Sequence, residues 1–188
     1  MMVDKDTVVL GVLDFSSIAV GINALDAMVK IAPIKVIDAR TICPGKFLIV
    51  FTGDVASVEY SYRKGFEIGA GFVVDSLFLA QIHPEVLEAI GNIKQTELWE
   101  SVGIIETLSV VSSIEAADIA AKVSGVNIVE VRLAVGFGGK SYVKMIGNLN
   151  DVQASVEAGS EKVSSKNLLC AKTVISQPHV EIRPFFMN

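Results

Sequence analysis

The feature that most constrains the fold is an internal repeat. Shifting the 188-residue sequence by 92 positions brings identical residues into line through the first part of each copy, and the shift becomes 94 after a short loop. The identical pairs include Gly11 with Gly103, Asp26 with Asp118, Lys30 with Lys122, Lys46 with Lys140, Gly53 with Gly147 and Gly65 with Gly159. The repeat predicts two tandem domains, at residues 1–92, which includes a linker, and at residues 93–188.

Hydrophobic patterning predicts the same elements in each copy. In the first copy, runs rich in β-branched residues predict strands at 8–13, 36–42, 47–51 and 72–79. Between them, Ile18, Ile22, Leu25 and Val29 fall on one helical face. A second helix is expected to begin after Asp54 as N-cap and to end near Gly69.

The second copy shows the corresponding strands at 102–107, 128–135, 141–146 and 168–175, with helices at 110–122 and 152–163. A short linker helix is expected at 84–90. The order β-α-β-β-α-β predicts an α/β (α+β) protein made of two ferredoxin-like domains, each with helices on one face of an antiparallel sheet.

Composition indicates a self-associating protein that is not embedded in a membrane. Hydrophobic residues make up 51% of the chain, more apolar surface than a small domain readily buries. No run reaches the roughly 18 to 20 apolar residues of a membrane span, and the acidic N-terminus does not resemble an export signal. The net charge of −5 argues against a nucleic-acid partner. We expect a cytosolic oligomer.

Three segments, 26–30, 53–55 and 177–179, read DAMVK, GDV and QPH. In this order on this fold, they resemble the shell proteins of bacterial microcompartments, twice over. The resemblance implies a tandem-domain shell protein of the bacterial cytoplasm that forms a pseudohexameric homotrimer and tiles with other shell proteins. It implies no enzymatic activity. It also implies tile-edge contacts at Lys30, Lys122, Gln177 and His179, although the arginine usual in the last motif is missing here.

The segment 41–47, TICPGKF, resembles the pore loop of the iron-sulfur-binding type among the shell proteins of propanediol-utilisation microcompartments. That resemblance implies one [4Fe-4S] cluster per trimer, shared by three Cys43 thiolates on the threefold axis. It implies that Pro44, Gly45 and Lys46 line the pore. Encapsulated redox enzymes are then possible partners. A single thiol per chain becomes a cluster site only through symmetry.

The second copy carries a glycine-rich loop where the first copy carries Cys43. By alignment, Gly136, Phe137, Gly138 and Gly139 are expected to line the same opening. The loop resembles the end of a phosphate-binding P-loop, but a strand rather than a helix is expected after Lys140 and Ser141, so nucleotide binding is not expected. The other cysteine, Cys170, is expected to be a packed, inert thiol in an apolar strand.

The sequence leaves three functions open. The first is a shell tile that binds a cluster and transfers electrons across the shell, or delivers intact clusters or iron. The second is a cofactor-free tile with a metabolite pore. The third is a ligand-sensing trimeric regulator, which would bind a small molecule and form no sheets.

Overall fold

The computed structural model describes residues 9–136 and 138–188 and divides into two compact units, with the boundary between Ile82 and His83. The linker segment that follows β4 therefore belongs to the second unit. No helix in the described part of the chain has the length and apolar character needed to cross a bilayer.

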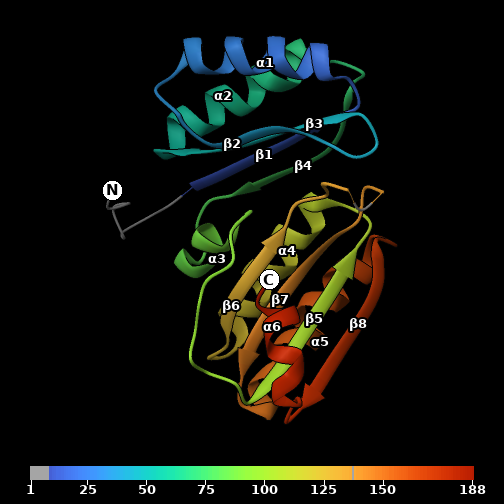
Figure 1. The fold of residues 1–188 in the computed structure, drawn as a ribbon. Helices are drawn as coiled ribbons and strands as arrows, with labels where there is room; N and C mark the ends of the chain where they lie inside the picture. The colour runs from blue at the N-terminus through green and yellow to red at the C-terminus, as the bar shows by residue number, and fades with distance from the viewer. Residues whose placement is uncertain (1–8, 137) are drawn as a thin grey trace. The chain divides into compact units, whose positions relative to one another are not determined.

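The first unit is a four-stranded antiparallel sheet with the strand order β2-β3-β1-β4. Its helices α1 and α2 lie on one face of that sheet (Figure 1). The elements are β1 (Val9–Phe15), α1 (Ile18–Ile31), β2 (Lys35–Ile42), β3 (Lys46–Gly53), α2 (Val55–Ile68) and β4 (Val73–Leu79). The predicted ferredoxin-like arrangement is confirmed.

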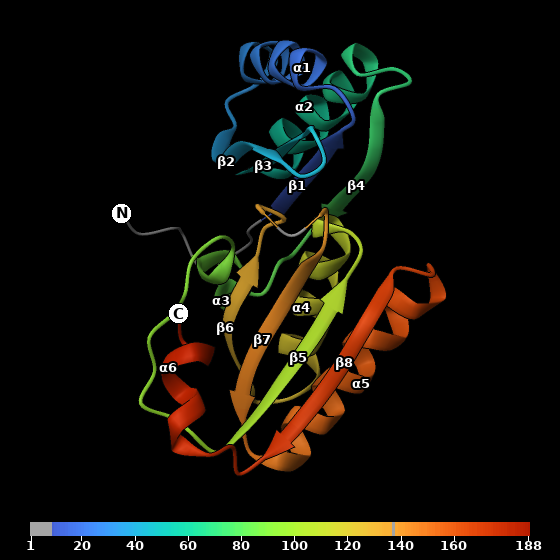
Figure 2. The same ribbon diagram turned by 45° about the vertical axis from the view of Figure 1, so that its right-hand side comes forward.

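The second unit repeats this arrangement with the strand order β6-β7-β5-β8 (Figure 2). Its elements are α3 (Pro84–Ala89), β5 (Ser101–Thr107), α4 (Val110–Val123), β6 (Asn127–Arg132), β7 (Ser141–Gly147), α5 (Leu149–Ser165) and β8 (Leu169–Ser176). A 3₁₀ turn (Val180–Ile182) and α6 (Arg183–Phe186) follow β8. No pattern in the sequence had predicted this C-terminal helical segment.

The helix boundaries follow local signals. Asp54 caps α2 by accepting the Ser57 N–H at 2.9 Å, and Gly69 ends the helix, as predicted. In α1, however, small residues and one methionine face the core: Gly21, Ala24 and Met28 are buried. Ile22 and Val29 are 53% and 43% exposed. Of the predicted apolar face, Ile18 and Leu25 pack partly buried against the core, whereas Ile22 and Val29 lie on the outward side of the helix.

The reason is close packing between helix and sheet. A Cβ added to Gly21 would lie 2.7 Å from Cδ1 of Phe47 on β3, so only glycine lets α1 approach the strand this closely. The first core consists of aromatic and aliphatic side chains that fill the space under the two helices, among them Leu13, Phe15, Met28, Ile49 and Phe51.

The C-terminal segment covers the face of the second sheet that lies opposite α5. Phe186 packs on Val102, Val129 and Ile146, and its ring meets Trp99 edge to face at 5.7 Å. Lys144 donates to the Phe186 carbonyl oxygen at 2.7 Å, which fixes the backbone at the end of α6.

Candidate functional site

Cys43 lies in the tight turn between β2 and β3, whose last paired residues are Ile42 and Lys46. The thiol is partly exposed and unbonded to another cysteine, while Pro44 and Gly45 are exposed. Gly45 has φ +69°, a conformation that glycine adopts without strain, and no atom lies within 4 Å of the position where a Cβ would be. The turn therefore presents a small, sterically open tip that carries one accessible thiol.

A buried ion pair stands at the base of this turn. The Lys46 ammonium lies 2.7 Å from Oδ2 of Asp14 on β1, and the Asp14 side chain is fully buried. Burial raises the pKa of Asp14, although the hydrogen bond and the charge of Lys46 oppose this effect, and the nearby Asp75 charge adds to it. The lysine at the predicted pore loop is thus held in place by a carboxylate of its own unit.

The second unit has an equivalent ion pair, which is more exposed to solvent. Lys140 lies 3.0 Å from Oε1 of Glu106, with side-chain exposures of 47% and 34%. The Glu106 hydrogen bond raises the pKa of Lys140, and the neighbouring thiol of Cys170 raises it further. The sequence alignment paired these acids and these lysines. Asp14 aligns with Glu106 and Lys46 aligns with Lys140, so the repeat carried a signal for both ion pairs, although neither pair was predicted.

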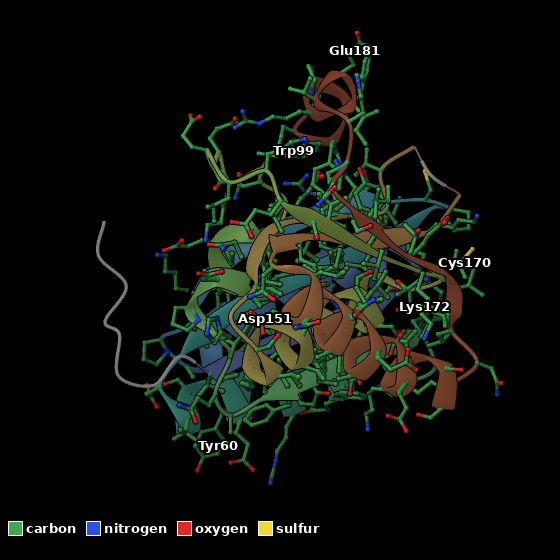
Figure 3. The ribbon with its side chains drawn as sticks, turned by 90° about the horizontal axis from the view of Figure 1, so that it is seen from below. Tyr60, Trp99, Asp151, Cys170, Lys172 and Glu181 are labelled. Carbon is green, nitrogen blue, oxygen red and sulfur yellow. The ribbon has the colours of Figure 1, made fainter. Side chains whose placement is uncertain are left out.

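The expectation that Cys170 is packed is wrong. Cys170 is exposed, and its side chain points outward from β8 (Figure 3). It lies where the pairing register between β5 and β8 shifts, after Glu106. The expectation relied on the apolar residues around Cys170, but β8 is an edge strand of this unit and none of its residues is buried.

The glycine-rich loop joins β6 and β7, as the Cys43 turn joins β2 and β3. Gly136, Gly138 and Gly139 all have positive φ, between +62° and +91°. A strand, β7, begins directly after Lys140, at Ser141, so this loop lacks the helix that a P-loop requires. Phe137 lies outside the described residues.

The four predicted tile-edge residues are all exposed. Lys30 and Lys122 each pair with an aspartate one helical turn earlier, at 2.5 and 2.6 Å. His179 accepts the Glu181 N–H through Nδ1 at 3.3 Å and so caps the turn after β8, and Gln177 has φ +51°.

The described residues contain no group of three or more His, Cys, Asp or Glu side chains placed to hold a metal ion. Cys43 and Cys170 are the only cysteines in the sequence. A cluster at Cys43 would therefore draw its other cysteine ligands from other copies. The donor type, the accessible thiol and the open turn are compatible with such sharing.

Comparisons with known proteins agree with the fold. The family model of the BMC domain matches residues 9–82 and again residues 101–178. The bacterial microcompartment shell protein PduT of Citrobacter freundii is 42% identical over 170 residues, which is 90% of this chain and 92% of that protein. Carboxysome shell protein CsoS1B of Hydrogenovibrio crunogenus is 39% identical over 92 residues, which is 47% of this chain and 91% of that protein.

A crystal structure of a microcompartment protein from Desulfitobacterium hafniense superposes with a TM-score of 0.88 at 41% identity. The match covers 94% of this chain and 98% of that one. Two BMC domains in tandem, on this fold and with these relatives, identify the chain as a member of the BMC-domain family, the non-enzymatic structural shell proteins of bacterial microcompartments.

Proposed function

We propose that this shell protein forms a homotrimer in which three Cys43 thiolates hold one [4Fe-4S] cluster on the threefold axis. The supporting observation is the β2–β3 turn, which presents one accessible thiol at a sterically open tip. Because a closed ring of three copies multiplies each position by three, one thiol per chain supplies three ligands. The fourth iron then takes a ligand from outside the protein.

The chain's own residues prepare this site in two ways. Gly45 keeps the tip narrow, so that three turns can approach one axis. The Asp14–Lys46 pair anchors the first residue of β3, which fixes the base of the turn. Since Lys46 is already paired with a carboxylate, it contributes less net positive charge to the thiolates than an unpaired lysine would.

When bound, a cluster of this kind supplies one-electron transfer. In a shell wall, it would let electrons pass from one side to the other without opening a path for metabolites. Encapsulated redox enzymes are the partners that this role requires, next to the other shell proteins. Delivery of clusters or iron would use the same three thiols. The remaining pore-loop residues, Gly136, Gly138 and Gly139, would line the opening around the site.

The test is anaerobic purification with iron and sulfide quantitation, visible absorbance and EPR of the reduced protein. We expect close to four iron atoms per three chains in the wild type and in Cys170→Ser, and none in Cys43→Ser. Cys170→Ser is the matched control because it removes the other thiol of the chain. Iron retained in Cys43→Ser would contradict the proposed ligand.

A tile with a cofactor-free metabolite pore is the second candidate. It is favoured by the positive-φ glycines of the β6–β7 loop, Gly136, Gly138 and Gly139, of which the first two are exposed, because successive backbone N–H groups in such turns can bind a solute anion. It predicts colourless, iron-free protein under the same anaerobic conditions. The regulator hypothesis is not retained, because the chain belongs to a family of structural shell proteins.

A further inference from the structure

The two copies of the repeat differ in the surroundings of one conserved ion pair. On α4, Asp118 pairs with Lys122, and the aspartate side chain is only 5% exposed. On α1, the equivalent Asp26 pairs with Lys30, and both side chains are more than half exposed, at 57% and 71%. The same contrast holds for the apolar neighbours: Ile114 is fully buried, whereas its equivalent Ile22 is 53% exposed.

The linker helix α3 accounts for part of this difference, because it packs on α4 and on the edge strand β6. The His83 N–H donates to Oδ1 of Asp118 at 2.8 Å. Oε2 of Glu85 accepts the Ile128 N–H at 3.1 Å, and the Gly91 N–H reaches the Val131 carbonyl oxygen at 3.0 Å. Helix α3 therefore supplies hydrogen bonds to both the helix and the edge of the sheet.

An equivalent of α3 follows β8. The sheet registers pair Leu79 with Leu10 and Ile175 with Val102, so the repeat shift in the last strand is 96. Continued past the strand, this shift aligns His83 with His179 and Glu85 with Glu181. It also aligns α3 (Pro84–Ala89) with the helical turns from Val180 to Phe186.

The side chains that α3 buries are exposed in its C-terminal equivalent. Val86 and Ala89 are fully buried, but the aligned Ile182 and Phe185 are 38% and 81% exposed. Glu181 is 87% exposed and points away from its unit (Figure 3). Phe186 is meanwhile anchored on the second sheet. The equivalents of the α3 residues that contact α4 and β6 therefore lie on the exposed side of this segment.

We propose that residues 179–185 of one copy dock on α1 and the edge of β2 in the first unit of a second copy, as α3 docks on α4 and β6. The His179 N–H then donates to Asp26, and Glu181 accepts the Val36 N–H, the equivalent of Ile128. Ile182 and Phe185 cover Ile22 and Val29. Phe186 stays on its own sheet.

This inference rests on the proposed trimer and gives it a specific contact. The contact is heterologous, since a C-terminal segment meets a different surface on the next copy, and three such contacts close a ring. Four exposed apolar side chains, Ile22, Val29, Ile182 and Phe185, lose water when it forms, and this burial is the main driving force. Docking would cover the Asp26 carboxylate and leave Lys30 exposed, as Asp118 is buried and Lys122 is 44% exposed in the second unit.

Paired cysteines test the contact. In the variant His179→Cys with Asp26→Cys, mild oxidation should link chains through these positions and give bands of two and three chains and none larger. Peptide mass spectrometry identifies the bridge, so the native cysteines stay in place. The matched control, His83→Cys with Asp118→Cys, should form a bridge within one chain. His179→Cys with Glu59→Cys, whose second position lies on α2, should form none.

A second measurement does not depend on oxidation. Native mass of the double variant Ile182→Asp with Phe185→Asp should fall from trimer to monomer, whereas Tyr60→Asp, at an exposed position on α2, should keep the trimer mass. Suppose that the wild type is a trimer. The docking would be overturned if the variant His179→Cys with Asp26→Cys formed no bridge between positions 26 and 179, a bridge within one chain, or linked species of more than three chains. None of these results would contradict the trimer. A monomeric wild type would overturn the trimer itself.

Discussion

Replacing Lys46 by methionine should destabilise the protein by leaving Asp14 without its partner. Asp14 is fully buried, and the Lys46 ammonium at 2.7 Å is its compensating charge. Removing one partner of a fully buried pair costs about 3 to 5 kcal/mol. Because Lys46 is 24% exposed, water can partly replace it, and we expect a cost of roughly 2 to 3 kcal/mol. Urea unfolding should show this as a midpoint lowered by about 1 to 2 M.

The contribution of Asp14 to the free energy of unfolding should depend on pH. Burial raises the pKa of Asp14 above 3.8, so the folded protein binds this proton more tightly than the unfolded chain does. Asp14 therefore lowers stability as the pH rises from 3.8 to its raised folded pKa. Asp14→Asn should gain stability relative to wild type across that window. In Lys46→Met the window should extend to higher pH, because both influences that lower this pKa are lost.

Lys140→Met is the matched control, since it breaks the equivalent pair in the second unit. Glu106 stays 34% exposed there, so this variant should lose much less stability than Lys46→Met. Both variants are compared with wild type at pH 5 to 8 by urea unfolding. Equal losses in Lys46→Met and Lys140→Met would refute the argument from burial.

Four further changes test local packing and helix capping. Gly159→Ala should destabilise by about 1 to 3 kcal/mol in urea unfolding, because its Cβ would lie 2.9 Å from the backbone oxygen of Ala116; Gly65→Ala should cost less, since it meets only side-chain atoms. Phe186→Ala removes the anchor of the C-terminal segment, and limited proteolysis should then cut between residues 178 and 188 faster than in wild type. Asn148→Ala removes the cap of α5 and should cost about 1 kcal/mol, checked by thermal unfolding.

Much of the fold could be predicted because its determinants are local. Strand and helix periodicity, the Asp54 cap and the stop at Gly69 act within a few residues, and the repeat provides a second reading of each element. The turn at Cys43 was predictable for the same reason, since Pro44 and Gly45 are adjacent turn residues. The orientation of α1 was not, because Ile22 and Val29 have the spacing of a core face and yet lie outside.

The sequence by itself determined that there are two ferredoxin-like copies, the order of their strands and helices, and that one thiol sits on a turn between two strands. Only the tertiary structure decided which side of α1 meets the sheet, that Asp14 is buried against Lys46, that Cys170 is exposed, and that the C-terminal segment folds onto the second sheet. These features depend on contacts between residues far apart in the chain, such as Gly21 with Phe47. Steric fit and burial at such contacts outweigh local hydrophobic pattern.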